Sequence, residues 1–213
     1  MTEAFDKAAL DYGHRLFIRP VAFVTGALSE DALPITSLPE IAFAGRSNVG
    51  KSSLINTLVG QRQLARVSNT PGRTQEINFF DLGGRLMIVD LPGYGYAQAP
   101  KDKAAIWAVF IKRFLKGRTQ LRRAYVLIDS RHGIKPQDED IMTLMDESAV
   151  NYQIILTKTD KIKPDELVRC QAAVTEAAAK HVAAHPVVLA TSSVDGAGMP
   201  ELRAALSELA LPE

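Results

Sequence analysis

From residue 40 onward, apolar positions follow two different spacings along the chain. Short, nearly continuous apolar runs have the length and β-branched content of buried strands, and they occupy residues 40–45, 122–129, 151–157 and 185–192. Elsewhere apolar residues recur every three or four positions, as in helices with one buried face, at residues 51–60, 101–117, 137–147, 164–182 and 199–211. Strand and helix segments therefore alternate along most of the chain.

Two further strands are predicted over residues 76–82 and 85–90, because Gly83–Gly84 between them is a hairpin signal. The alternation predicts an α/β fold, with a mostly parallel sheet flanked by helices on both faces. Residues 1–38 are less regular and contain two prolines. We expect them to form an N-terminal extension packed on a main domain of residues 39–213.

Composition narrows the class of protein. The chain has 213 residues, of which 46% are hydrophobic and 23% charged, as in a soluble globular domain. No apolar run approaches the roughly 18–20 residues that cross a bilayer, and the N-terminus does not resemble a secretory signal. The single cysteine excludes an internal disulfide, and the four histidines lack zinc-ligand spacing. These features predict a cytoplasmic protein that does not associate with membranes.

Two local features each have two interpretations. Residues 103–128 contain seven Lys or Arg and no Asp or Glu, although the formal net charge of the chain is only +1. Such a stretch is either a binding surface for phosphates or a solvated face. Cys170 has helical spacing from Leu167 and Val174, which favours a buried apolar role over a catalytic thiol.

The segment GRSNVGKS, at residues 45–52, matches the phosphate-binding pattern G-x-x-x-x-G-K-[ST] and lies between a predicted strand and a predicted helix. Its glycines let backbone N–H groups surround phosphate oxygens at a helix N-terminus. Lys51 is expected to contact the β- and γ-phosphates, and Ser52 to bind Mg²⁺. The predicted phosphate-binding residues are Gly45, Arg46, Ser47, Asn48, Val49, Gly50, Lys51, Ser52 and Ser53.

Two segments at later strand ends predict which base is bound. In TKTD, at residues 157–160, Asp160 can accept hydrogen bonds from the guanine ring N–H and amino group, which adenine cannot match. The stem of Lys158 can cover the base, and the TSS segment can donate backbone N–H groups to the guanine oxygen. The predicted base-binding residues are Thr157, Lys158, Thr159, Asp160, Thr191, Ser192 and Ser193.

The remaining predicted contacts lie in two loops. DLPG places Asp90 at a strand end, where it can reach Mg²⁺ through water, and Gly93 where its N–H can meet the γ-phosphate. In the polar loop 66–75, Thr74 is the predicted second Mg²⁺ ligand and Thr70 the alternative. The predicted contacts in these loops are Gly72, Arg73, Thr74, Gln75, Glu76, Asp90, Leu91, Pro92 and Gly93.

The segments GRSNVGKSS, TPGRTQ, DLPGYGYA, TKTD and TSS, in this order, resemble the bacterial EngB (YihA/YsxC) GTPases, in the Era/TrmE-like class. The resemblance covers roughly residues 15–210. It implies a Ras-like fold, GTP and Mg²⁺ binding, and a role as a switch in assembly of the large ribosomal subunit, with a link to cell division and septation. Most GTPases have Asn where this chain has Thr157. We therefore expect the contact that the Asn side chain makes with the phosphate loop to be lost.

The residue after Gly93 bears on catalysis. Small signalling GTPases place a water-orienting glutamine there, whereas this chain has Tyr94, whose phenol is no base at neutral pH. We therefore predict slow hydrolysis that relies on Lys51, Mg²⁺ and loop N–H groups. The resemblance implies that Asn48 helps to bind a stimulating K⁺ ion; the alternative is that it satisfies the loop backbone.

Three kinds of function remain in view. The first is a monomeric switch whose basic stretch 103–128 contacts rRNA phosphates of a large-subunit precursor, together with ribosomal proteins. The second is a GTP-dependent protein-binding module of the division machinery without rRNA contact. A metabolite kinase is disfavoured, because TKTD indicates guanine and no acceptor-binding domain is visible.

Overall fold

The computed structural model describes residues 5–61, 64–65, 76–94 and 101–212, with no side chains for residues 101–108. Its strands form a seven-stranded sheet in the order β1-β3-β4-β2-β5-β6-β7. The strands are β1 Val21–Ala27, β2 Glu40–Gly45, β3 Ile77–Leu82, β4 Leu86–Asp90, β5 Leu121–Asp129, β6 Tyr152–Thr157 and β7 Leu189–Ala190. The α-helices are α1 Lys7–Phe17, α2 Lys51–Leu58, α3 Lys101–Gly117, α4 Pro136–Glu147, α5 Pro164–Ala178 and α6 Met199–Ser207.

The sheet is mostly parallel. β2 pairs in parallel with β4 on one side and β5 on the other, and β6 and β7 continue the parallel part. The predicted hairpin is confirmed, since β3 and β4 are antiparallel and β1 adds to β3 as an antiparallel edge strand. The predicted α/β fold is thus confirmed, and the carboxyl ends of β2, β4, β5 and β6 open at one edge, where such sheets bind ligands.

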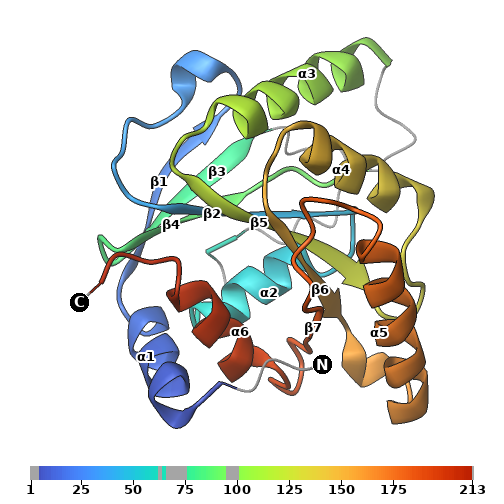
Figure 1. Cartoon of the computed structure of the whole chain (residues 1–213). Helices are drawn as coiled ribbons and strands as arrows, with labels where there is room; N and C mark the ends of the chain where they lie inside the picture. The colour runs from blue at the N-terminus through green and yellow to red at the C-terminus, as the bar shows by residue number, and fades with distance from the viewer. Residues whose placement is uncertain (1–4, 62–63, 66–75, 95–100, 213) are drawn as a thin grey trace.

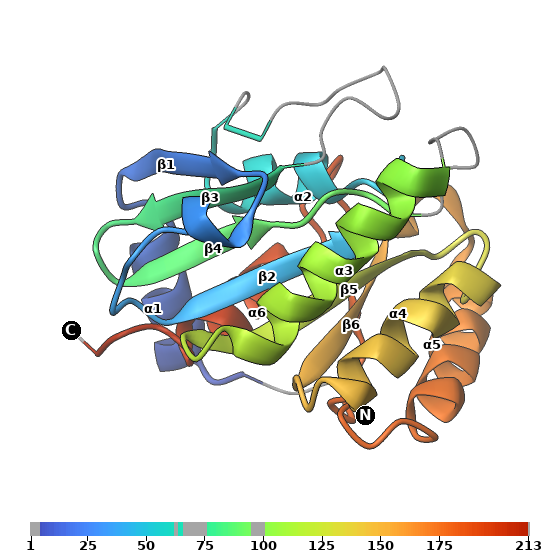
Figure 2. The same ribbon diagram turned by 90° about the horizontal axis from the view of Figure 1, so that it is seen from above.

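Helices cover both faces of the sheet (Figures 1 and 2). One core cluster joins the sheet to buried side chains of α3, α4 and α5, and the other joins it to α1, α2 and α6. In α3, Phe110 and Phe114 are buried, which confirms the predicted core role of these two aromatic residues. The two clusters fix α2 and α4 on opposite faces, and both helices begin at the edge that carries the predicted site.

The first 38 residues contain more regular structure than their sequence pattern indicated. They hold helix α1, whose N-terminus is capped by Asp6 accepting a hydrogen bond from Ala9 N (2.8 Å), and the edge strand β1. α1 packs closely on α6, since a Cβ at Gly13 would lie 2.7 Å from Ala204 N. The boundary at residue 38 stays a prediction.

The strand predicted over residues 185–192 is wrong in extent, because β7 spans only Leu189–Ala190, although His185 N and Thr191 N also donate to β6 carbonyls. Pro186 has no N–H to donate to the ladder. The Val187 carbonyl accepts a hydrogen bond from the Gln153 side chain (3.1 Å), and the Val188 carbonyl accepts one from Gln171 (2.8 Å). Side-chain amides therefore satisfy backbone groups that a longer strand would have paired.

Two helices end earlier than predicted: α5 at Ala178 rather than residue 182, and α6 at Ser207 rather than residue 211. Beyond α5, the chain is held by α4 instead. Asp146 contacts His181 Nδ1 at 2.7 Å and accepts a hydrogen bond from Ala183 N at 2.9 Å. Within the described part of the chain, no helix has the length and apolar character needed to cross a membrane.

Candidate nucleotide-binding site

The predicted phosphate loop connects β2 to α2. Asn48 and Gly50 adopt positive φ angles of 65° and 108°, and Gly50 directly precedes the first residue of α2. The φ at Gly50 is one that side-chain-bearing residues rarely adopt, which accounts for glycine at this position. The loop therefore combines left-handed residues with a helix N-terminus, as anion-binding loops do.

Lys51 opens α2 and forms an ion pair with Asp90, the last residue of β4. Both side chains are nearly buried, with 11% exposed. The pair places the predicted phosphate-contacting cation beside the predicted Mg²⁺-directed carboxylate. Ser52, the next residue of α2, is half-buried.

The turn after β4 lies on the phosphate loop. Tyr94 N donates to the Gly45 carbonyl (3.2 Å), and Ser47 N donates to the Tyr94 carbonyl (3.1 Å). A Cβ at Gly93 would lie 3.1 Å from Ser47 Oγ and 3.3 Å from Ser47 N, so the two backbones are nearly in contact. A larger residue at position 93 would require the turn or the loop to shift by a few tenths of an ångström. Leu91 and Pro92 are buried.

The Tyr94 side chain is part of the core cluster on the α3–α5 face. Its hydroxyl donates a 2.8 Å hydrogen bond to Asp138 of α4, and only 8% of the residue is exposed. Burial, followed by the negative charge of Asp138, raises the pKa of Tyr94 far above its usual value. The hydroxyl is therefore neither an acid nor a base for the reaction, in agreement with the interpretation from the sequence.

Because Asn is replaced by Thr at position 157, we expected the contact of an Asn side chain with the phosphate loop to be lost, but Thr157 makes a contact of its own with this loop. Thr157 ends β6, and its Oγ1 donates to the Val49 carbonyl at 2.7 Å and approaches the Ile128 carbonyl at 3.3 Å. The residue is buried, with 4% exposed. A threonine hydroxyl therefore makes a tie to the phosphate loop where a longer amide was expected to be required.

Lys158 makes a second tie to the same loop. It has a positive φ of 58°, and its Nζ donates to the Asn48 carbonyl (2.6 Å) and to Asp129 (2.9 Å). Burial alone would raise the pKa of Asp129, but hydrogen bonds from Arg131 and Lys158 outweigh it and hold this pKa well below its usual range. Sequence reasoning did not assign Asp129; its one signal was its position at the end of the predicted strand 122–129.

Asp160 faces the loop that follows β7. Ser192, which is fully buried, donates to its carboxylate (2.9 Å), and Lys161 pairs with its other oxygen at 3.1 Å. Burial would raise the pKa of Asp160, but the hydrogen bond from Ser192 and the Lys161 contacts lower it, so the carboxylate is ionised at neutral pH. Thr191 is tied to β6, because its N and its Oγ1 both donate to the Leu156 carbonyl.

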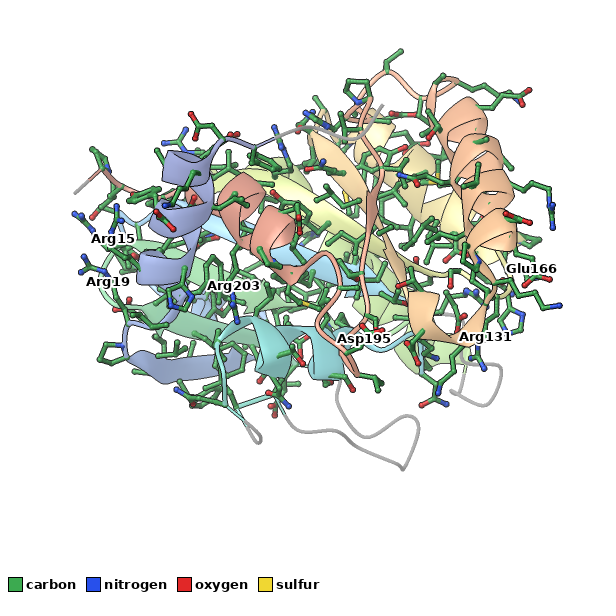
Figure 3. The ribbon with its side chains drawn as sticks, turned by 90° about the horizontal axis from the view of Figure 1, so that it is seen from below. Arg15, Arg19, Arg131, Glu166, Asp195 and Arg203 are labelled. Carbon is green, nitrogen blue, oxygen red and sulfur yellow. The ribbon has the colours of Figure 1, made fainter. Side chains whose placement is uncertain are left out.

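Ser192 also organises its own loop by accepting hydrogen bonds from Val194 N (3.2 Å) and Asp195 N (3.4 Å). Thr159 N donates to the Thr191 carbonyl (3.3 Å), which joins the two predicted base-binding segments. Ser193 is half-buried beside them. Figure 3 shows Asp195 and Arg131 at the same edge of the molecule, while Arg15, Arg19 and Arg203 lie toward α1 and α6.

Part of the predicted site lies outside the described residues, namely Gly72, Arg73, Thr74 and Gln75, together with the alternative ligand Thr70. Glu76 is described and half-buried, and its carboxylate approaches Gly26 of β1, where an added Cβ would lie 2.7 Å from Oε2. Among the described residues, no group of three or more His, Cys, Asp or Glu side chains is arranged to hold a metal. Protein carboxylates alone therefore do not make a metal site in the described part of the chain.

Three of the seven cations of the basic stretch 103–128 are paired with carboxylates within the protein, which its sequence pattern did not indicate. Arg118 makes a bidentate pair with the fully buried Glu40, Lys112 pairs with Glu147, and Arg113 pairs with Glu30. Two of its cations, Lys116 and Arg122, are exposed and make no ion pair with described residues. The charge available for a phosphate partner is therefore smaller than the sequence suggests.

Cys170 is half-buried rather than buried, and it packs against the core cluster on the α3–α5 face. Burial raises its pKa, which disfavours the reactive thiolate. It lines a cleft of about 590 Å³ between α5 and residues 130–134. The predicted apolar role agrees with this packing.

Comparisons with known proteins match this chain to GTP-binding proteins. A family model described as the 50S ribosome-binding GTPase matches residues 40–158, and one described as the elongation factor Tu GTP-binding domain matches residues 107–212. A probable GTP-binding protein EngB of Rhodospirillum rubrum is 57% identical over 209 residues, covering 96% of this chain and 90% of the relative. Another, of Rhodopseudomonas palustris, is 52% identical and covers 98% of each chain.

Solved structures show the same fold. The crystal structure of a probable GTP-binding protein EngB has a TM-score of 0.62 at 26% identity, covering 80% of this chain and 97% of that one. Era in complex with MgGDPNP and a 16S ribosomal RNA fragment has a TM-score of 0.64 at 22% identity, covering 82% and 57% of the two chains. The chain therefore belongs to the EngB family of GTP-binding proteins, within the P-loop GTPases.

Proposed function

We propose that the protein is a cytoplasmic GTP-driven switch in assembly of the large ribosomal subunit. Two side-chain pairs carry the nucleotide part of the proposal: Lys51–Asp90 at the phosphate loop and Asp160–Ser192 at the base-binding loops. Both pairs lie at the carboxyl ends of the parallel strands, as nucleotide sites do in such sheets. GTP rather than ATP is expected, because an ionised Asp160 can accept two hydrogen bonds from guanine.

The residues present fit a magnesium ion bound together with the nucleotide. The Ser52 hydroxyl and the Asp90 carboxylate are oxygen donors, which Mg²⁺ prefers, and phosphate oxygens usually complete its shell. Ser52 would hold the ion directly and Asp90 through water, with Thr74 as the proposed second protein ligand. When bound, the ion neutralises charge that develops on the phosphates during hydrolysis.

In hydrolysis, Lys51 and the N–H groups of the phosphate loop stabilise the charge on the transferred phosphoryl group. Gly93, held against Ser47, contributes its N–H to the γ-phosphate. With the Tyr94 hydroxyl turned into the core, no glutamine-like group follows Gly93, so we expect slow intrinsic turnover. A stimulating factor would then set the timing of the switch.

Potassium is one proposed stimulant, through Asn48. This residue is exposed, and its side chain makes no hydrogen bond with any described residue, so it is available to an ion rather than tied to the loop backbone. Replacing K⁺ by Na⁺ should lower the hydrolysis rate of the purified protein. An equal hydrolysis rate in K⁺ and Na⁺ would show that Asn48 does not act by binding a stimulating K⁺ ion.

The base specificity is tested with Asp160→Asn. An Asn amide can donate to the 2-oxo group of xanthine, whereas it cannot accept both guanine donors. The variant should lose at least about a hundredfold in GDP affinity and gain affinity for xanthosine diphosphate, by analogy with sites whose buried polar groups lose their partners. Asp165→Asn, an exposed acid five residues away, is the matched control and should change neither affinity.

The ribosomal partner is supported by the description of the matched family, the 50S ribosome-binding GTPase. Exposed Lys116 and Arg122 lie in the basic stretch, and Lys116 lines a groove of about 480 Å³ beside α3. Co-sedimentation with large-subunit precursors in GTP, but not in GDP, should weaken steeply with salt. Combined Lys116→Glu and Arg122→Glu substitution should reduce it, whereas the exposed Lys180→Glu control should not.

The alternative is a GTP-dependent protein-binding module of the division machinery, which would also connect the protein to septation. It predicts a salt-tolerant partner and no co-sedimentation with ribosomal subunits. Gel filtration with and without nucleotide tests the proposed monomer, which should elute at the position of a 23.2 kDa chain.

A further inference from the structure

Asp138 is a buried carboxylate that the nucleotide chemistry described above does not use. It lies in the first turn of α4 and is completely buried. Its carboxylate caps the helix by accepting from Lys135 N at 2.9 Å. A cap of this kind needs only one acceptor and is found on exposed helices, so capping alone does not account for the burial of a charged group.

Two further donors explain the burial, and both come from the nucleotide site. Arg46, the second residue of the phosphate-loop motif, donates from Nε to both carboxylate oxygens, at 3.1 and 3.3 Å. Tyr94 donates from its hydroxyl at 2.8 Å. The positive charge of Arg46 compensates the buried negative charge, and the Tyr94 hydroxyl donates a further hydrogen bond to Oδ1. The carboxylate therefore has protein donors for both oxygens.

The same two residues are joined through their backbones. Arg46 and Tyr94 form an isolated parallel bridge, made by the hydrogen bonds of Tyr94 N to Gly45 and of Ser47 N to Tyr94. Asp138 thus closes a small ring. Its carboxylate binds the side chains of Arg46 and Tyr94, whose segments are already hydrogen-bonded to each other through their main chains. Gly93, the proposed γ-phosphate contact, lies next to this ring and against Ser47.

We propose that Asp138 is a positioning residue that, through Tyr94 and Arg46, holds the Gly93 turn on the phosphate loop in the arrangement that receives the γ-phosphate. The inference rests on the proposed function and adds a reason for tyrosine after Gly93. A turn fixed in advance loses less conformational freedom when the γ-phosphate binds. GDP lacks that phosphate and does not gain from the arrangement.

The test compares affinities for GDP and for a non-hydrolysable GTP analogue in the full chain. Tyr94→Phe keeps the buried ring and removes only the hydrogen bond to Asp138. We expect it to weaken binding of the analogue at least about tenfold, the effect of losing one hydrogen bond to a charged group, and to change GDP binding less than about twofold. Tyr152→Phe is the control, because that buried hydroxyl makes no hydrogen bond with the described residues.

Asp138→Asn is the second variant, since it keeps the shape of the side chain and removes its charge. It should shift the same affinity ratio, and the double variant should shift it by less than the sum of the two single effects. A residue that only stabilises α4 would lower the melting temperature and leave the ratio unchanged. An unchanged ratio in both folded variants, or an equal loss for both nucleotides, overturns the proposal. Failure of the unmodified protein to bind either nucleotide would instead overturn the proposed function.

Discussion

Thr157 gives the sharpest test of how the proposed guanine-binding segment, residues 157–160, supports the phosphate loop. Its hydroxyl donates to the Val49 carbonyl at 2.7 Å from a position that is 96% buried. Thr157→Val replaces that hydroxyl with a methyl group of nearly the same size, so the packing stays and the donor is removed. The Val49 carbonyl then loses this donor in the interior.

The buried hydrogen bond sets the loss of stability expected for Thr157→Val. A buried hydrogen bond contributes about 0.5–1.5 kcal/mol, and leaving a buried partner unsatisfied costs about 1–3 kcal/mol. We therefore expect the variant to lose about 1–2 kcal/mol of unfolding free energy, measured by urea denaturation without nucleotide. Because the lost bond ends on the phosphate loop, the dissociation constant for GDP should also rise about fivefold to tenfold.

Thr157→Ser is the matched control, because it keeps the hydroxyl and removes the methyl group. It also loses some stability, about 1 kcal/mol for one buried methyl group, but its GDP affinity should stay within about twofold of the unmodified protein. Equal losses of GDP affinity in the Val and Ser variants would refute the reasoning, because packing rather than the hydrogen bond would then position the loop. Unchanged GDP affinity in both variants would show that the hydrogen bond from Thr157 to Val49 contributes to folding and not to nucleotide binding.

Three further predictions concern stability. The raised pKa of Tyr94 means that the folded state favours its protonated form. Its contribution to the unfolding free energy is therefore complete below about pH 10 and is lost as the pH rises further. Tyr94→Phe should flatten this alkaline loss of unfolding free energy by up to about 1.4 kcal/mol per pH unit. The pKa of Asp129 is held below its usual range, so its contribution is complete above about pH 4 and declines in acid, and Asp129→Asn should flatten the acid limb of the stability profile. Glu40→Gln breaks a buried pair with Arg118 and should cost about 3–5 kcal/mol in urea denaturation.

The sequence predicts well those features whose cause is local. The phosphate loop is one, because the φ of 108° at Gly50 requires glycine and the following helix must begin at once. The hairpin of β3 and β4 is another, since Gly83–Gly84 dictates a tight turn. In both cases, the residues that specify the geometry are neighbours along the chain.

The ties that hold the site together are not local, and they have no signature in the sequence. Asp138 belongs to an acidic helix that reads as a solvated face, yet its partners Arg46 and Tyr94 come from 92 and 44 residues away. Arg118 belongs to a stretch that the sequence assigns to a phosphate-binding surface or to a solvated face, whereas it pairs with Glu40, 78 residues earlier. Burial decides the role of such charges, and burial depends on the packing of whole elements.

The hydrogen bonds from Thr157 and Lys158 give the proposed guanine-binding segment a second role. Lys158, proposed to cover the base, also donates to the Asn48 carbonyl, while Thr157 holds Val49, the next residue of the same loop. A base that displaced Lys158 would therefore disturb the phosphate loop as well as lose its own contacts. If the proposed base and phosphate contacts hold, both depend on Thr157 and Lys158, so a poorly fitting base would also weaken phosphate binding. The requirement at position 157 is thus a donor within reach of Val49, which threonine meets as well as a longer amide would.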